Sequence, residues 1–188
     1  MRVGFMGSSG TGKTTLARWV SERFGLPLNP VGSRSVAAAM GLASPYDVDA
    51  AGRRDEFQRR LRAEKIAWEL AHERFVSDRT TLDDLAYAAL HLAGELDERF
   101  VDEALLHARD AYDVVFYCPV ASFQHLGHDP ARKASLGYHR LLDAFLRGLE
   151  QTGMVGAVEL SEADAPARQE TVERWMRSIA ANMDVLLP

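Results

Sequence analysis

The chain has 188 residues, of which 47% are hydrophobic and 26% are charged, a composition typical of a soluble globular protein with a full core. Its formal net charge of −5 argues against a protein that binds nucleic acid non-specifically, because such proteins are normally basic. No apolar run approaches the ~20 residues of a membrane-spanning helix, and no signal peptide precedes the first strand. The single cysteine, Cys118, excludes an internal disulfide. We therefore expect a cytoplasmic protein without membrane contact.

Runs of strand-forming residues alternate with helical patterns along the whole chain. The strand-like runs cover residues 3–6, 25–30, 75–78, 112–118 and 154–160. Helical patterns cover residues 15–20, 51–72, 96–109 and 167–183, and a further helix starts at Thr81. This alternation predicts a parallel sheet covered by helices on both faces. Since no long linker divides the chain, we expect an α/β fold with a five-stranded parallel sheet in one domain over residues 1–188.

A complete phosphate-binding loop follows the first strand directly. It reads Gly7, Ser8, Ser9, Gly10, Thr11, Gly12, Lys13 and Thr14, with Thr15 next in the helix that begins here. The glycines let several backbone N–H groups point at one anion, and the N-terminus of the helix adds a partial positive charge. Lys13 can reach the β- and γ-phosphates, and the Thr14 hydroxyl can ligate Mg²⁺. We predict that the residues from Gly7 to Thr15 bind a nucleoside triphosphate.

The strand predicted at residues 75–78 ends in a carboxylate, Asp78, beside Arg79. Ligands of open α/β sheets bind outside the carboxyl ends of the strands, which favours a functional role for this pair. Asp78 would hold Mg²⁺, directly or through water, or would accept the proton of an acceptor hydroxyl. Arg79 would hold a phosphate or orient the acceptor, supported by Asp83. The alternatives are a surface salt bridge for the pair and a simple acid at a helix start for Asp83.

Residues 122–138 have the composition of a lid, with Gly127, Pro130, Arg132 and Lys133. In phosphoryl-transfer enzymes such segments close over the triphosphate and bring cations to the transferred group. The alternative is an ordinary polar loop.

Three further features allow more than one interpretation. Five arginines between residues 53 and 62 would bind phosphate or form a solvated helix face: Arg53, Arg54, Arg59, Arg60 and Arg62. Trp68 would pack in the core or stack on a base. His125 and His128 lack the further ligands that a structural zinc site needs.

The segment from Phe75 to Tyr87, which begins Phe-Val-Ser-Asp-Arg-Thr, resembles the D-R-[ST]-x-x-D-x-x-A-Y signature of a group of small P-loop kinases. This group includes the nicotinamide riboside kinase domain of a bacterial NAD regulator and the phage 5-hydroxymethyluridine DNA kinases. Thymidylate kinases carry a related Asp-Arg motif at the corresponding strand end. The resemblance covers the P-loop, the Asp-Arg segment and the lid.

The resemblance implies that Asp78 and Arg79 lie at the acceptor site, where we also expect Asp83 to bind the substrate, and that Arg132 of the lid contacts the γ-phosphate. It also implies that residues 29–35 bind the acceptor, which makes Arg34 an acceptor ligand. Deoxynucleoside kinases usually carry a glutamate in that region, and none occurs here. This departure argues against a free nucleoside as acceptor and favours Asp78 as the base.

We therefore expect an ATP-dependent, Mg²⁺-requiring kinase in which Lys13, Asp78, Arg79 and Arg132 are catalytic and Thr14 and Asp78 bind the metal. The favoured acceptor is 5-hydroxymethyluracil in phage DNA, which would place the enzyme in the host cytoplasm. A free nucleoside, a nucleoside monophosphate and nicotinamide riboside are the alternatives within this class, and a homodimer is compatible with it. Outside the class, the alternative is a switch or motor NTPase.

Overall fold

The fold is built on a parallel sheet of four strands in the order β2-β1-β3-β4. The computed structural model describes residues 1–92, 96–120, 135–153 and 155–183. The strands are β1 (Arg2–Met6), β2 (Phe75–Asp78), β3 (Val114–Tyr117) and β4 (Ala157–Glu159). Because every pairing is parallel, the carboxyl ends of all four strands meet at one edge of the sheet.

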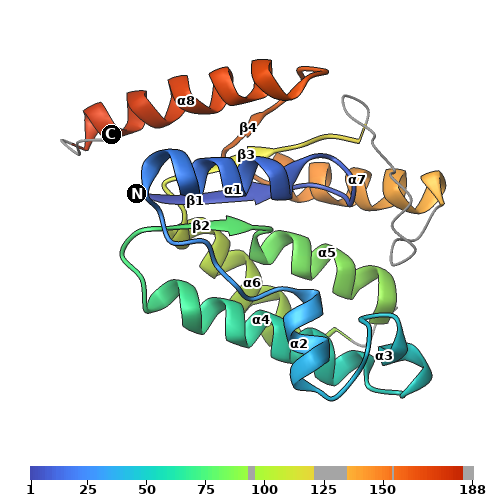
Figure 1. The fold of residues 1–188 in the computed structure, drawn as a ribbon. Helices are drawn as coiled ribbons and strands as arrows, with labels where there is room; N and C mark the ends of the chain where they lie inside the picture. The colour runs from blue at the N-terminus through green and yellow to red at the C-terminus, as the bar shows by residue number, and fades with distance from the viewer. Residues whose placement is uncertain (93–95, 121–134, 154, 184–188) are drawn as a thin grey trace.

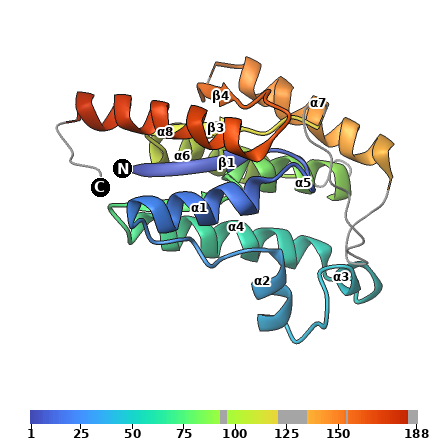
Figure 2. The same ribbon diagram turned by 45° about the horizontal axis from the view of Figure 1, so that its top comes forward.

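Helices cover both faces of this sheet (Figures 1 and 2). One face carries α1 (Lys13–Phe24) and α8 (Ala165–Asn182), and the other carries α5 (Thr81–Leu92), α6 (Glu98–Ala111) and α7 (Leu136–Gln151). Strand β3 explains the layering, since Val114 and Phe116 pack toward α1 and α8, whereas Val115 and Tyr117 pack toward α5, α6 and α7. A strand buried on both faces is apolar throughout, as a parallel sheet requires.

A third group of helices lies beyond β2, at the edge of the sheet (Figure 1). It consists of α2 (Ser33–Ala39), α3 (Asp47–Ala50) and α4 (Arg54–Leu70), held together by their own apolar cluster. The helix predicted at residues 51–72 begins only at Arg54, because Gly52 turns the chain with a φ of 63°. The helices α2 and α3 were not predicted; the start of α2 and the residues just before α3, Pro45 and Tyr46, line the site described below.

The expected fifth strand at residues 25–30 is reduced to a single parallel bridge between Leu28 and Val76. Two backbone hydrogen bonds support it, from Val76 N–H to Pro27 O at 2.9 Å and from Asn29 N–H to Val76 O at 2.8 Å. Pro27 and Pro30 have no N–H to donate, so a longer ladder cannot form here. The four-stranded sheet therefore corrects the predicted count, and the segment lies beside β2.

The other predicted elements lie where the patterns indicate them, with ends shifted by a few residues. Most of the lid expected at residues 122–138 lies outside the described residues. The described chain resumes at Ser135, which is the N-cap of α7. Among the helices that the structure describes, none is both long enough and apolar enough to cross a membrane.

Candidate active site

The predicted phosphate-binding loop joins β1 to α1 at the carboxyl edge of the sheet. Gly7, Gly10 and Gly12 adopt φ values of 141°, 81° and 86°, a region that favours glycine. At Gly7 there is also no space for a side chain, because a Cβ would lie 2.4 Å from the carbonyl oxygen of Cys118. The glycine spacing that identifies the motif in the sequence is thus required by the curvature of the loop.

Asp83 lies beneath this loop. Its Oδ1 accepts a hydrogen bond from the Gly7 N–H at 3.0 Å, and its Oδ2 accepts from the N–H and the hydroxyl of Thr80 at 2.9 and 3.1 Å. The side chain is 0% exposed and lines neither of the cavities described below. The carboxylate of Asp83 therefore holds the P-loop to the start of α5, and its role in binding the acceptor stays a prediction.

Two more buried side chains hold the loop from other helices. His139 of α7 shares a hydrogen bond of 2.9 Å with the Ser8 hydroxyl through its Nδ1. Arg168 of α8 donates from Nη1 to the Thr11 carbonyl at 2.7 Å. Both side chains are 1% exposed. Helices from both faces of the sheet thus fix the shape of the P-loop.

Lys13 lies inside the curve of the loop and is 4% exposed. Its ammonium donates to the Ser8 carbonyl at 2.5 Å and to the Thr11 hydroxyl at 3.2 Å. Burial, followed by the positive charge of Arg79, lowers the pKa of Lys13 below its ordinary value. An anionic ligand would offset both effects and favour the charged form.

Thr14 and Asp78 meet at the mouth of the site. The Thr14 hydroxyl donates a hydrogen bond of 2.5 Å to Asp78 Oδ2. The other carboxylate oxygen, Oδ1, is buried and has no hydrogen-bond partner within the described part of the chain. A hydroxyl and a carboxylate with an unsatisfied oxygen are hard oxygen ligands of the kind that Mg²⁺ prefers.

Arg79 follows directly, in an unusual backbone conformation. Its φ of 98° is a strained value for a residue with a side chain, and its N–H donates to the Phe5 carbonyl at 3.0 Å. The guanidinium donates to the Ser9 hydroxyl at 3.1 Å and lies 4.7 Å from the centre of the Tyr87 ring. Burial disfavours its charge, but negative partners led by Tyr87 outweigh burial and raise the pKa of Arg79. Arg79 is therefore a fixed positive charge beside the P-loop.

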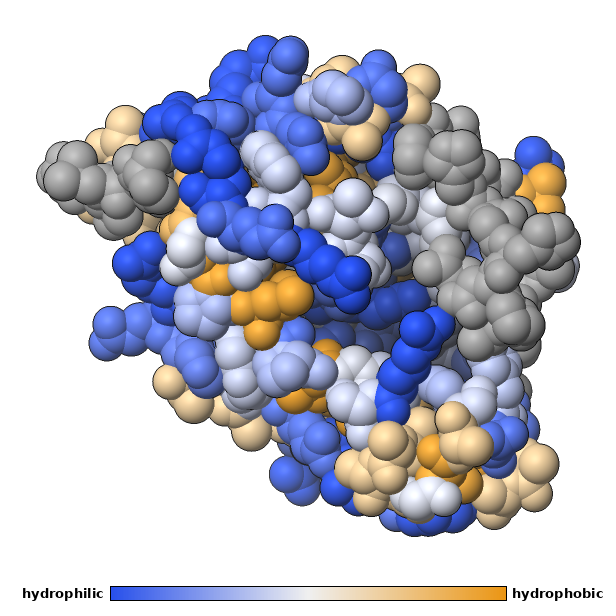
Figure 3. Space-filling model, in the orientation of Figure 1, coloured by the Kyte–Doolittle hydropathy of each residue, from blue (hydrophilic) through white to orange (hydrophobic). Residues whose placement is uncertain are grey.

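A wide cleft of about 830 Å³ runs along the P-loop. Its opposite wall is the segment 28–35, and Asp78 and Arg79 form part of its floor. The space-filling view shows hydrophilic side chains around the hollow on this face of the molecule (Figure 3). Arg34 and Arg18 line the same cleft, and the role of Arg34 as an acceptor ligand stays a prediction.

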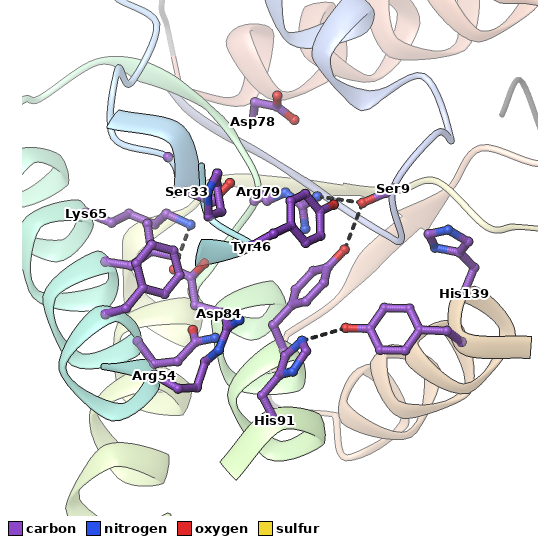
Figure 4. Close-up of a pocket in the computed structure, with 17 residues that line it drawn as sticks. Ser9, Ser33, Tyr46, Arg54, Lys65, Asp78, Arg79, Asp84, His91 and His139 are labelled. Atoms are coloured by element: carbon purple, nitrogen blue, oxygen red, sulfur yellow. Dashed lines mark hydrogen bonds and ion pairs between the residues drawn. The ribbon is translucent and has the colours of Figure 1, made fainter. Parts of the chain in front are cut away.

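A smaller pocket of about 130 Å³ lies on the other side of Asp78 and Arg79. Three tyrosines, Tyr46, Tyr87 and Tyr138, contribute aromatic surface to it. In Figure 4, Lys65 and Arg54 lie on one side of this pocket and His139 on the other, with Arg79 and Ser9 above it. The two cavities share Ser9, Asp78 and Arg79, so they meet at these residues.

The remaining predictions have different outcomes. Arg132 lies outside the described residues, as do His125 and His128. Within the part of the chain that the structure describes, no three His, Cys, Asp or Glu side chains gather as a metal cluster would require. Trp68 stacks on His72 with ring centres 3.8 Å apart and does not line the pocket, which favours the packing interpretation.

The arginine-rich stretch turns out to be paired with acids rather than free for a polyanion. Four of its members form ion pairs of 2.6 to 2.8 Å with carboxylates outside the two cavities: Arg53 with Glu56, Arg54 with Asp49, Arg60 with Glu64 and Arg62 with Glu103. Arg59 bridges Asp55 and Asp97. Only Arg54 of this group lines the pocket beside the P-loop.

Sequence patterns did not identify His139, Arg168 or the polar side chains of α4 that line the pocket. These residues lie in helices whose patterns predict only amphipathic packing. The available signal was a polar residue at a helix position expected to be buried, such as Gln58 beside Phe57 and Leu61. Such positions are identified only when the register of the helix against its neighbours is known.

The chain matches the model of a family described as an AAA domain, AAA_28, over residues 2–177. No curated protein matches the chain. The structure is similar to deoxyadenosine kinase from M. mycoides with bound dATP, with a TM-score of 0.62 at 14% identity over 94% of this chain and 100% of that one.

Two other solved structures show the same fold. Shikimate kinase from Aquifex aeolicus has a TM-score of 0.61 at 19% identity, over 97% of this chain and 98% of that one. The NadR protein in complex with NR has a TM-score of 0.60 at 16% identity, over 100% of this chain and 52% of that one. At these identities the likeness establishes the α/β P-loop kinase fold. The family model spans nearly the entire chain, and the protein therefore belongs to the AAA_28 family of AAA domains.

Proposed function

We propose that this protein is an ATP-dependent phosphotransferase that moves the γ-phosphate of ATP to a hydroxyl group of a nucleoside- or nucleotide-type acceptor. The observation that carries this proposal is the place of Asp78 and Arg79, between a P-loop cleft and a second, smaller pocket that both residues also line. An NTPase needs water at the γ-phosphate, whereas a transferase needs a second place that orients an acceptor. The kinase fold of the similar structures supports the same assignment.

In this proposal the chain acts mainly by positioning and by charge. The P-loop N–H groups and Lys13 hold the phosphates of ATP, and Arg79 places a fixed charge beside the transferred group. Arg132 of the predicted lid would add a further cation at the γ-phosphate. Thr14 and Asp78 would hold Mg²⁺, which when bound would neutralise charge on the phosphates.

Asp78 retains two possible roles in the reaction. Its Oδ2 faces the Thr14 hydroxyl, as a metal ligand would, directly or through water. Its Oδ1 is buried without a partner among the described residues, and Asp78 lines both cavities, as a base for the acceptor hydroxyl would. No glutamate occurs at residues 29–35 to take the second role.

We propose a nucleoside-type acceptor for the transferred phosphate. Two of the similar structures are titled as a deoxyadenosine kinase and as NadR with NR, which favours a nucleoside-type acceptor. We retain 5-hydroxymethyluracil in DNA as the favoured acceptor because the acceptor-side glutamate is missing. The acid-paired arginines of α4 no longer support it. We also propose a cytoplasmic enzyme, and sedimentation of the purified protein would show whether it is a homodimer.

The decisive experiment offers γ-labelled ATP with a panel of acceptors: free nucleosides, nucleoside monophosphates, nicotinamide riboside and duplex DNA that contains hydroxymethyluracil. A kinase labels at least one of them, and Asp78→Asn nearly abolishes the labelling while ATP still binds. Rapid ATP hydrolysis with no labelled acceptor would instead support a switch or motor NTPase. Equal or greater labelling of free hydroxymethyldeoxyuridine than of the duplex would eliminate the DNA acceptor.

A further inference from the structure

The smaller pocket is built from one face each of two helices. On α4, the residues that line it recur at helical spacing: Arg54, Phe57, Gln58, Leu61 and Lys65. On α5, the spacing is the same: Asp84, Tyr87 and His91. Since α4 and α5 pack directly against each other below the carboxyl edge of the sheet, these faces form a fixed wall rather than a loop surface.

Gln58 stands out on this wall. It is 2% exposed, and its Oε1 is buried without a hydrogen-bond partner among the described residues. Its neighbours in the helix, Phe57 and Leu61, pack into the apolar cluster under α2 and α3. A buried amide is normally paired, since an unsatisfied polar atom destabilises the fold. Because Gln58 lines the smaller pocket, a ligand in that pocket would supply the missing partner of its Oε1.

Two cations that line the pocket away from Asp78 and Arg79, Lys65 and Arg54, are each paired with a carboxylate within the protein. The Lys65 ammonium lies 2.7 Å from Asp84 Oδ2, and both side chains are 2% exposed. The Arg54 guanidinium lies 2.7 Å from Asp49. The pocket therefore offers an anionic ligand no uncompensated cation at its inner end. This electrostatic balance suits an uncharged ligand.

The volume of the pocket limits what can enter it. At about 130 Å³ it is smaller than the roughly 300–1,000 Å³ of pockets that enclose whole drug-sized ligands. One flat ring fits such a space, with the rest of the molecule left in the wider cleft that adjoins it at Asp78 and Arg79. The aromatic side chains of Phe57, Tyr87 and Tyr138 supply apolar surface for a ring.

We propose that Gln58 is a specificity-determining residue that binds the ring of the acceptor. Its amide pairs with the edge of an uncharged heterocycle that carries an N–H donor next to an acceptor atom, as the edges of nucleobases do. The ring enters the smaller pocket, and the hydroxyl to be phosphorylated remains near Asp78. This inference rests on the proposed function and narrows it, because it rejects acidic acceptors such as shikimate and cationic rings such as that of nicotinamide riboside.

The test compares Gln58→Leu with Gln151→Leu, a control at the exposed C-terminal end of α7. Binding of deoxyadenosine, thymidine, deoxycytidine, nicotinamide riboside and shikimate is measured by calorimetry, and transfer from labelled ATP is measured in parallel. We expect wild-type protein to bind at least one uncharged nucleoside more tightly than the two charged compounds. Gln58→Leu should weaken that binding, and raise the acceptor KM, by at least about tenfold while the KM for ATP stays unchanged.

Thermal unfolding separates recognition from a structural role. Removing an unpaired buried amide should leave the Tm of Gln58→Leu no lower than that of the wild type, and up to about 4 °C higher. A lowered Tm with unchanged acceptor binding would overturn the inference, as would preferential binding of shikimate. If nucleosides bind through Gln58 but no acceptor is labelled, the proposed kinase function is wrong, and the inference that Gln58 binds the ring is kept. If Gln58→Leu leaves phosphoryl transfer unchanged, the proposed kinase function is kept, and the inference that Gln58 binds the ring is overturned.

Discussion

Thr14 and Asp78 lie 64 residues apart in the sequence, yet the Thr14 hydroxyl donates a 2.5 Å hydrogen bond to the Asp78 carboxylate. The sheet brings them together. Strands β1 and β2 pair in parallel with Phe5 opposite Asp78, so the loop after β1 and the end of β2 emerge side by side. The two oxygen ligands expected for the metal thus meet because of strand register.

This relationship predicts a specific dependence on the Thr14 hydroxyl. Thr14→Val keeps the shape of the side chain and removes the oxygen, so we expect phosphoryl transfer to fall about 10²–10³-fold. Thr14→Ser keeps the oxygen and should retain most of the activity. The measurement is initial rate against Mg²⁺ concentration, with a chelator as the metal-free control. Equal rates for the two variants would exclude Thr14 as a metal ligand.

Gly7 should not tolerate a side chain. In Gly7→Ala the new Cβ would lie 2.4 Å from the Cys118 carbonyl, at a φ of 141° that disfavours alanine. We expect a loss of about 1–3 kcal/mol in the free energy of unfolding, together with weakened ATP binding, since the loop must shift. Gly148→Ala is the matched control, because this exposed position in α7 has open space around it. Urea denaturation should show the control to be about 0.5–1 kcal/mol more stable than the wild type.

Arg79 combines a proposed role in phosphoryl transfer with backbone strain. Its φ of 98° favours glycine over any residue with a Cβ, so Arg79→Gly should be about 1–2 kcal/mol more stable than Arg79→Ala. Both variants lose the guanidinium and should lose transfer activity to a similar, large extent. Denaturation and transfer assays on the same preparations check the two statements separately. Alanine and glycine variants of equal stability would show that the strain does not persist.

Cys118 should make stability depend on alkaline pH. Burial raises the pKa of its thiol from 9.0 to about 11. Between these values the unfolded chain loses the proton and the native protein keeps it, so the native state binds more protons and stability falls as pH rises. Relative to Cys118→Ala, the wild type should lose about 2–3 kcal/mol of unfolding free energy between pH 9 and pH 11. A difference between the two proteins that stays constant with pH would contradict this prediction.

Much of the donor site could be predicted from sequence. The P-loop is a contiguous stretch whose glycines and hydroxyls act through local backbone geometry, so the pattern from Gly7 to Thr15 suffices to identify it. Asp78 and Arg79 were identifiable because they end an apolar strand, and the sheet edge brings such ends together. The fifth strand predicted at residues 25–30 is wrong because Pro27 and Pro30 have no backbone N–H to donate to a neighbouring strand. The segment therefore pairs with β2 only through the bridge between Leu28 and Val76.

The sequence by itself determined the fold class, the phosphate cradle and the strand end that faces it, because each depends on residues adjacent in the chain. Only the tertiary structure decided that Asp83 holds the P-loop, that the arginines of α4 are paired with acids, and that Gln58 lines a pocket with no partner for its Oε1 among the described residues. These outcomes depend on which face of a helix meets which neighbour. A helical pattern specifies that a face is buried, but the partner of each polar atom is set by packing between elements distant in sequence.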